Sequence, residues 1–338
     1  MKTHFGTLPS GTDTYLYTIR SGKLLARISD YGATLVQLLV PDNQGALADV
    51  VLGFDDCNGY RACSALLGAT VGRNCNRIAG AKFKLGDKQY HLEANNGKNN
   101  LHGSTDHYGF RLWKVESHTE SQIVLFLHSP HGDQGFPGNA DIRVTYSLEK
   151  GDTLRIRYDA VSDRDTVFNL TNHSYFNLAG HQNPQRALDQ TMIFPARVFC
   201  PTDSENITTG EERSVVGTPF DFREPKPIRR DIDADYETMK HQRGYDHTFE
   251  VFCDPAAILC DPVSGRTMAI CTDCPGVHLY SGNFIDEQLG KEGVKYGPYA
   301  GMALETQFYP NSVNYPHWKQ PFTPANTPYH SETTYTFK

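Results

Sequence analysis

Apolar and polar residues alternate with a period of two along much of the chain. Between residues 142 and 148, Ile, Val, Tyr and Leu occupy every second position, and Arg, Thr and Ser lie between them. The alternation resumes over residues 154–158, after the turn Glu149-Lys150-Gly151-Asp152. Because successive side chains of a strand point to opposite faces, this pattern predicts a β-hairpin with one buried and one solvated face.

Similar alternation predicts strands in six further segments, which clusters of Gly, Pro, Asn and Asp separate. These segments are residues 15–28, 81–92, 113–128, 167–176, 247–252 and 267–280. Only two short stretches, residues 56–65 and 234–242, suggest helices. Many strands without helices between them favour a sandwich or barrel over a parallel α/β sheet. No linker or change of composition marks a boundary, so we expect an all-β fold with one large antiparallel domain over residues 1–338.

Composition and charge narrow the range of partners. The 338 residues have a net charge of -7, which disfavours a partner with a phosphate backbone such as nucleic acid. The best apolar run, residues 33–40, is far shorter than the roughly 18 residues of a membrane span. The first residues show no apolar secretory segment, and eight cysteines are too few for a disulfide scaffold. We therefore expect a cytoplasmic protein that does not bind membranes.

The cysteines also bear on metal binding. Cys271 and Cys274 form the single C-x-x-C pair of the chain. A structural zinc site needs a second pair of ligands at a fitting spacing, and Cys260 and His278 are the nearest soft ligands in the sequence. Ordinary half-buried thiols explain this pair more simply, so we expect no metal site.

Several kinds of catalysis lack their usual motifs. The chain has no phosphate-binding glycine loop, no G-x-S-x-G nucleophile elbow and no H-E-x-x-H zinc motif. What remains is a set of His and carboxylate residues in a chain with 18 Phe and 18 Tyr. Aromatic faces rimmed by Asn, Asp, Arg and His suit a sugar, whose ring has apolar C–H faces and polar edges.

Three segments combine polar and apolar residues in a way that calls for partners. They are residues 71–78, 169–178 and 304–310. A buried polar group costs about 1–3 kcal/mol unless it is paired, so these segments need hydrogen-bond partners or a ligand. For any single histidine, a hydrogen-bonded structural role is the simpler explanation.

These segments resemble motifs of one enzyme family, the aldose 1-epimerases or galactose mutarotases. Gly72-Arg73 followed by Asn76-Arg77-Ile78-Ala79 is similar to the family's GR-x-x-NRI-A motif, and residues 169–178 are similar to its NLTNHSYFNL motif throughout. Seven matches follow the family's order between residues 31 and 314, which makes the resemblance specific. The other five are Asn100–Gly103 (NLHG), Asp133–Gly138 (resembling DGxxG(F/Y)PG), Gly244–His247 (GYDH), Tyr280–Phe284 (YSGNF) and Leu304–Gln307 (LETQ).

The resemblance implies a galactose mutarotase-like β-supersandwich with a shallow sugar cleft and no cofactor. It further implies interconversion of the α and β anomers of a free aldohexose, with D-galactose the usual substrate and D-glucose often accepted. That reaction needs a base for the C1 hydroxyl proton and an acid for the ring oxygen. Both tasks are general acid–base catalysis, and neither requires a nucleophile or a metal.

Residue roles follow from the same resemblance. Glu305 is the expected base and His173 the expected acid. A carboxylate beside His173 would raise the pKa of its imidazole, so we expect a bell-shaped pH profile with an acid limb from Glu305 and an alkaline limb from His173. Five further residues are expected to bind the sugar: His102 near the ring oxygen, Asp246 as a hydroxyl acceptor, Asn76 and Arg77 as donors, and His278 where the family often has Gln.

Other residues of the motifs are expected to be structural. Arg73 is assigned a pairing role inside the fold. Ordinary surface or hydrogen-bonded roles are expected for His107, His128, His131 and His247. Phe308 and Ser104 depart from the family pattern as His278 does, and these changes leave the preferred hexose open.

Three alternatives remain open at this stage. A hexose-6-phosphate epimerase on the same fold would need extra cationic residues around the cleft. A non-catalytic carbohydrate-binding protein would not need the acid and the base, which this chain has. A glycosidase would need two carboxylates, for which Asp246 and Glu305 are the candidates. The sequence is compatible with a monomer or a homodimer.

Overall fold

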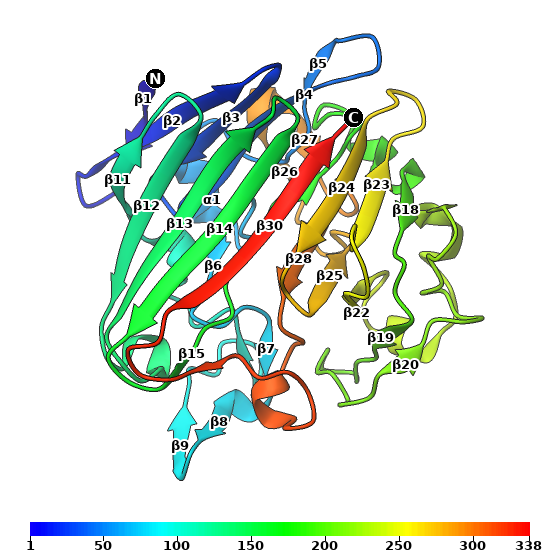
Figure 1. Ribbon diagram of the computed structural model, residues 1–338. Helices are drawn as coiled ribbons and strands as arrows, with labels where there is room; N and C mark the ends of the chain where they lie inside the picture. Colours follow the sequence, from blue (N-terminus) through cyan, green and yellow to red (C-terminus); the bar gives the residue numbers. More distant parts are fainter.

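The largest unit of the fold is a nine-stranded antiparallel sheet that crosses the front of the molecule (Figure 1). The computed structural model describes residues 1–338. The expected hairpin is confirmed, because the third and fourth strands of this sheet pair with Tyr146 opposite Ile156. In spatial order the strands are β11 (Lys114–His118), β12 (Gln122–Ser129), β13 (Ala140–Glu149), β14 (Thr153–Ser162), β30 (Tyr329–Phe337), β24 (Thr267–Thr272), β23 (Ala257–Cys260), β18 (Thr191–Ile193) and β21 (Lys226–Pro227).

Two further antiparallel sheets complete the frame. The first five strands of the chain form a meander in sequence order: β1 (Lys2–Thr7), β2 (Asp13–Ser21), β3 (Leu24–Ser29), β4 (Thr34–Pro41) and β5 (Leu47–Asp49). A six-stranded sheet has the order β17 (Tyr175–Phe176), β28 (Met302–Gln307), β25 (Gly276–Tyr280), β22 (Asp246–Glu250), β19 (Val198–Cys200) and β20 (Arg213–Ser214).

Short strand pairs and turns connect these sheets. The pairs are β6 (Thr70–Val71) with β16 (Thr171–Asn172), β7 (Arg77–Ile78) with β10 (Asn100–Leu101), β8 (Lys82–Leu85) with β9 (Lys88–His91), β15 (Thr166–Val167) with β29 (Phe322–Thr323), and β26 (Gln288–Leu289) with β27 (Lys295–Tyr296). Single 3-10 turns lie at Ala79–Ala81, Tyr108–Phe110, Asp133–Gly135, Pro184–Asp189, Ile228–Asp231, Glu237–Met239, Lys291–Gly293 and Ser312–Asn314.

One hydrophobic core connects the three sheets. Its largest cluster contains 55 buried residues, among them Ile19 of β2, Val144 of β13 and Leu304 of β28. The alternation along β13 places Ile142, Val144 and Tyr146 in this core, while the residues between them are partly exposed. The period-two pattern of the sequence therefore corresponds to the buried and solvated faces of the sheet.

The segment 167–176, which was expected to be a strand, is instead divided into three two-residue strands. These strands, β15, β16 and β17, pair with β29, β6 and β28. Along the segment, Asn side chains serve as hydrogen-bond partners of backbone N–H groups. Asn169 accepts from the N–H of Phe308, and Asn172 accepts from the N–H of Ser174. Because these side chains satisfy backbone groups, the segment can change partners without leaving those groups unpaired.

The two predicted helical stretches differ in outcome. Within residues 56–65, helix α1 (Cys57–Ala62) forms, and the Asp56 side chain caps its N-terminus by accepting from the N–H groups of Asn58 and Gly59. Within residues 234–242 only the 3-10 turn Glu237–Met239 forms. No helix of the protein has both the length and the apolar character needed to cross a bilayer.

Candidate active site

A cleft of about 440 Å³ opens where the six-stranded sheet meets the short strand pairs β6/β16 and β7/β10. Its walls include Arg77 of β7, the residue that follows β16, one residue from each of β22 and β28, and two residues of β25. All seven residues expected at the site line this single cleft: Asn76, Arg77, His102, His173, Asp246, His278 and Glu305.

Strand register aligns three of these side chains. His278 on β25 lies directly opposite Glu305 on β28 and opposite Thr248 on β22. Directly opposed residues of antiparallel strands project from the same face, and Asp246 shares that face because it lies two residues before Thr248. The hydrogen-bonding pattern of three strands therefore places Asp246, His278 and Glu305 on one wall of the cleft.

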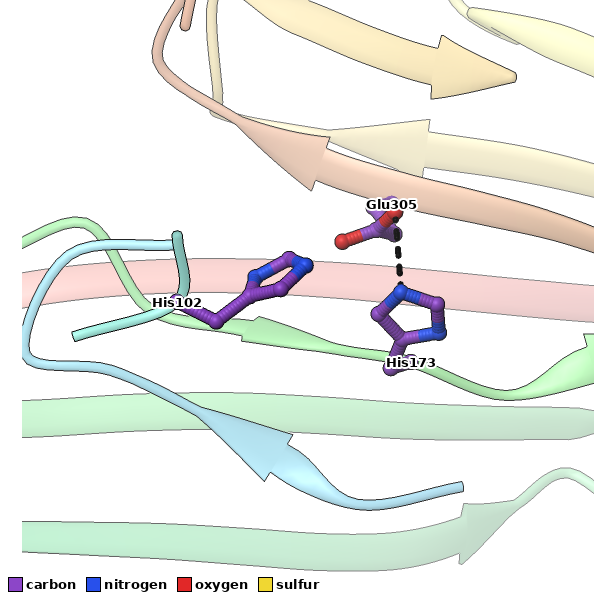
Figure 2. Close-up of side chains that lie close together, drawn as sticks. All are labelled: His102, His173 and Glu305. Carbon is purple, nitrogen blue, oxygen red and sulfur yellow. Dashed lines mark ion pairs between the residues drawn. The ribbon is translucent and has the colours of Figure 1, made fainter. Parts of the chain in front are cut away.

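The expected base and acid both line the cleft, and their side chains face each other (Figure 2). The Nε2 atom of His173 lies 3.5 Å from the Oε1 atom of Glu305. Glu305 is 2% exposed and His173 is 6% exposed. The second oxygen of Glu305 and the Nδ1 atom of His173 are buried without a hydrogen-bond partner in the protein. Unpaired polar atoms inside a fold are costly, and their presence here is typical of a functional site.

Burial sets the protonation of this pair. Removal from water raises the pKa of Glu305 to about 7 and lowers the pKa of His173 to about 4. The expectation that a nearby carboxylate raises the pKa of His173 is therefore wrong, because desolvation of the imidazolium outweighs the attraction of the charges around it. Between these two values the pair holds one proton, and in the free site that proton lies on Glu305.

His102 is held as a hydrogen-bond donor. Its Nδ1 atom lies 3.1 Å from the backbone nitrogen of Asn76, which can only donate, so Nδ1 accepts. Burial, and then the nearby His173, hold the pKa of His102 well below its usual range, so the ring is neutral. A neutral ring that accepts at Nδ1 has its hydrogen on Nε2. Figure 2 shows the ring of His102 beside the gap between the other two side chains.

The same tautomer bears on metal binding. His102, His173 and Glu305 bring one potential ligand atom each to within 4.8 Å of one another, a spacing that a divalent cation can use. A metal ligand needs a free lone pair, however, and His102 has none: Nδ1 accepts from Asn76, and Nε2 holds the hydrogen. The group is thus suited to donating a hydrogen bond to a ligand, and the expectation of a metal-free site remains a prediction.

Asp246 is a fixed acceptor. One of its oxygens lies 2.7 Å from the Nε2 atom of His278, and the other accepts from the amide of Asn206. The Nδ1 atom of His278 lies 2.8 Å from the hydroxyl of Thr248. Burial alone would raise the pKa of Asp246, but the hydrogen bond and charge of His278 outweigh it and lower the pKa to about 2. Asp246 is therefore ionised wherever the protein is folded near neutral pH.

Arg77 of β7 and Asn76 just before it supply donors to the cleft. The Nε atom of Arg77 donates to the side-chain oxygen of Asn96 at 3.2 Å. Arg77 forms no ion pair with a carboxylate, so the rest of its guanidinium can bind a ligand. Asn76 accepts from the N–H of Arg77 through its side-chain oxygen, and its side-chain nitrogen has no partner in the protein.

The structure confirms most of the structural assignments. Arg73 is fully buried, and its guanidinium donates to oxygens of Ser129, Pro137, Gly138 and Thr166. Three of the four histidines expected to be ordinary lie outside the cleft and have protein partners: His247 with Thr238 and with the N–H of Asp246, His128 with Asp141, and His131 with the N–H of Gly138.

His107 is the exception among the histidines expected to be ordinary, because it lines the cleft. Ser104 and Phe308, the other two departures from the family pattern, do not line it. Ser104 instead accepts from the N–H of Asp106, which is a local turn contact.

Sequence reasoning also missed one residue that supports the cleft from behind Asp246 and several that line it. Asn206, which holds Asp246, lies in the loop between β19 and β20 with a φ of 60°, a conformation that Asn tolerates better than most residues. No motif of the sequence singled it out. Apolar and aromatic side chains form further parts of the wall and suit the C–H faces of a sugar: Ala65, Leu66, Leu101, Tyr175, Tyr280 and Phe284.

Comparison with known proteins identifies the family. Residues 15–336 match the aldose 1-epimerase family. The chain belongs to this family. A galactose mutarotase from Mus musculus is 39% identical, over 99% of this chain and 98% of the relative. An aldose 1-epimerase from Haemophilus influenzae is 36% identical, over 92% and 91% of the two chains.

Solved structures of aldose 1-epimerases confirm the expected fold. The crystal structure of an aldose epimerase homologue from C. elegans has a TM-score of 0.89 and 31% identity, and the match covers 96% of this chain and 99% of that one. The galactose mutarotase-like all-β architecture expected from the sequence is therefore correct. As a member of this family the protein is an isomerase.

Proposed function

We propose that this protein interconverts the α and β anomers of free aldohexoses, that D-galactose is its main substrate and that D-glucose is also accepted. The observation that carries the proposal is the buried pair of His173 and Glu305, whose Nε2 and Oε1 atoms lie 3.5 Å apart in the cleft. Relatives that are named galactose mutarotases support the choice of galactose.

In the proposed reaction Glu305 removes the proton of the C1 hydroxyl and His173 protonates the ring oxygen. The electrons of the broken O–H bond form the C1 carbonyl, while the bond between C1 and the ring oxygen breaks. The open aldehyde then rotates about C1–C2 and presents its other face to the C5 hydroxyl. Reclosure runs the same transfers in reverse, so both groups return to their starting protonation state.

The protonation of the pair fits this exchange. The reaction needs an ionised Glu305 and a protonated His173, which together hold one proton. The free site also holds one proton between about pH 4 and pH 7, but on Glu305. A shift of that proton to His173 creates the base and the acid without changing the net charge. Hydrogen bonds from the sugar would favour this charged form by replacing the lost water.

The remaining cleft residues hold the sugar in this proposal. The Nε2–H group of neutral His102 donates beside the ring oxygen, and ionised Asp246 accepts from hydroxyl groups. Arg77 and Asn76 donate to other hydroxyl oxygens. His278 keeps Asp246 in place, and because both of its ring nitrogens are already bonded it meets the sugar through its ring alone. Each of these donors and acceptors has a fixed position, which favours orientation of the substrate before reaction.

The charge of the cleft favours a free sugar over a sugar phosphate. Arg77 is the only Lys or Arg residue among those that line it, and it shares the cleft with Asp246 and Glu305. A phosphate group usually requires several cations or backbone donors. We therefore place hexose 6-phosphates behind free hexoses as substrates.

We also propose that the whole chain acts as one domain, without a cofactor, as a monomer or a homodimer in the cytoplasm. The core cluster that runs from Tyr17 to Phe337 supports a single domain. All eight cysteines are free thiols, which supports a reducing compartment.

Polarimetry tests the proposed function. Freshly dissolved α-D-galactose and α-D-glucose are followed to equilibrium with and without the protein, and galactose 6-phosphate serves as the competing substrate. We expect faster equilibration of both free sugars and a loss of about 10²-fold or more in turnover for Glu305→Gln. His128→Gln, an exposed residue outside the cleft, is the matched control. Equilibration at the spontaneous rate with the purified wild type would overturn the proposal.

A further inference from the structure

His107 lines the cleft but has no part in the reaction proposed above. We infer that the Nε2 atom of His107 accepts a hydrogen bond from one hydroxyl group of the sugar and thereby contributes to substrate specificity. The inference rests on the proposed function and adds a specificity residue to it. Four observations carry it: the place of the ring, its tautomer, its free nitrogen and the rigidity of its loop.

The tautomer of His107 is fixed by the backbone. Its Nδ1 atom lies 3.1 Å from the carbonyl oxygen of His102. A carbonyl oxygen can only accept, so Nδ1 of His107 holds the hydrogen and donates. Burial lowers the pKa of His107, which favours the neutral ring near pH 7. In that ring Nε2 has a free lone pair and is an acceptor.

Nothing in the protein uses this lone pair. The Nε2 atom of His107 has no hydrogen-bond partner, although the ring lines the cleft. The ring is held edge-on against Phe110, with centroids 5.4 Å apart and an interplanar angle of 73°. It also meets the ring of His102 at a centroid distance of 6.5 Å. A fixed acceptor without a partner in a polar cleft is suited to a ligand donor.

The segment that presents His107 is anchored on both sides. Thr105 donates to Glu93 through both its backbone nitrogen, at 2.9 Å, and its hydroxyl, at 2.8 Å. The carbonyl of Asp106 accepts from Arg111 at 3.0 Å and from Gln134 at 3.2 Å. These contacts hold the two residues before His107, and on the other side the carbonyl of His107 accepts from the N–H of Phe110 at 2.9 Å. The backbone that presents the ring is therefore held without a ligand.

The two neighbouring histidines present opposite groups to the cleft. His102 offers an N–H donor, as its contact with Asn76 requires, and His107 offers an acceptor. A sugar ring oxygen can only accept, whereas a hydroxyl group can also donate. His102 can therefore bind the ring oxygen while His107 binds the hydrogen of a hydroxyl group nearby. Asp246, the other acceptor of the proposal, lies on the six-stranded sheet and would bind a different hydroxyl group.

Two variants of His107 and a set of deoxy sugars test the inference. His107→Phe keeps a planar ring and removes the acceptor, while His107→Gln can place an amide oxygen near the position of Nε2. With D-galactose we expect His107→Phe to raise KM by about 3- to 10-fold, the range of one neutral hydrogen bond, with kcat within about twofold. His107→Gln should restore most of the loss, and His128→Phe, outside the cleft, should change neither constant.

The 2-, 3-, 4- and 6-deoxy derivatives of D-galactose identify the hydroxyl group. For one of them the wild type should already show the raised KM, and His107→Phe should add nothing. An equal effect of His107→Phe on every sugar, or none on D-galactose, would overturn the inference. Calorimetric titration with D-galactose separates this result from failure of the proposed function. A wild type that binds without turnover would refute the reaction, whereas an unchanged Kd in His107→Phe would refute the contact.

Discussion

Glu305 is expected to destabilise the folded protein at alkaline pH, so Glu305→Gln should stabilise it there while removing turnover. The side chain is 2% exposed, and one of its oxygens is buried without a partner. Burial of the carboxylate disfavours its ionised form, which the reaction needs. Gln has nearly the same size and cannot ionise, so the substitution removes the charge and leaves the shape.

The magnitude follows from the pKa. Burial raises the pKa of Glu305 from an ordinary value of 4.5 to about 7. This pKa difference of about 2.5 corresponds to about 3 kcal/mol of unfolding free energy, because each pKa unit is worth about 1.36 kcal/mol. Below pH 4.5 the carboxyl group is protonated in both the folded and the unfolded state, and no penalty exists. Between pH 4.5 and 7 the unfolded state loses its proton first, and above pH 7 the full penalty applies.

Urea denaturation of the wild type and of Glu305→Gln between pH 4.5 and 8 measures this effect. The other titrating groups are the same in both proteins, so their contribution is removed when the two unfolding free energies are subtracted. We expect this difference to shift in favour of Glu305→Gln by about 3 kcal/mol over that range. Polarimetry on the same samples should show a turnover lower by about 10²-fold or more.

His173→Gln is the matched control, because it should show the opposite dependence on pH. Burial lowers the pKa of His173 from 6.5 to about 4. The unfolded state therefore takes up its proton first as the pH falls, and the wild type loses stability below pH 6.5 relative to this variant. A stability difference for Glu305→Gln that stays constant from pH 4.5 to 8 would show that the carboxylate is not destabilised, and the reasoning would fail.

Three further predictions concern activity. The pH profile of kcat/KM should be bell-shaped and fall below about pH 4 and above about pH 7, because the pair of His173 and Glu305 must hold one proton; a rate that keeps rising above pH 8 would contradict this. His278→Gln should keep turnover and mainly alter KM, because His278 holds Asp246 at 2.7 Å; a large loss of kcat at unchanged KM would place His278 in the chemistry. Dialysis against a chelator should leave the rate unchanged, and restoration of a lost rate by a divalent ion would overturn the metal-free mechanism.

Local patterns of the sequence predicted the structure correctly where residues close to one another in the chain determine it. The hairpin of β13 and β14 is confirmed because alternation and a turn of four residues lie next to each other in the chain. The segment 167–176 has similar alternation, yet it splits into three short strands. There the side chains of Asn169 and Asn172 bond to backbone groups, and Asn169 reaches a residue far away in sequence. Such long-range pairing has no local signal.

The resemblance to the family identified the seven expected site residues, and the structure places all of them in one cleft. The protonation states of these residues could not be predicted in the same way. A sequence shows that Glu305 and His173 are titratable, but the shift of each pKa depends on burial, which many distant residues create. The direction expected for His173 was therefore wrong, although its place in the cleft was right.

Two of the residues that sequence reasoning missed, Asn206 and His107, show what such reasoning cannot predict. Asn206 is one of several Asn residues in turns, and only the folded chain brings its amide to Asp246. His107 resembles His128 or His131 in the sequence, and what distinguishes it is a contact with the carbonyl oxygen of His102. That contact decides which ring nitrogen has the hydrogen, and the tautomer decides whether a sugar meets a donor or an acceptor. Because a backbone atom from another residue makes this choice, the chemistry of His107 depends on the fold as much as on its own side chain.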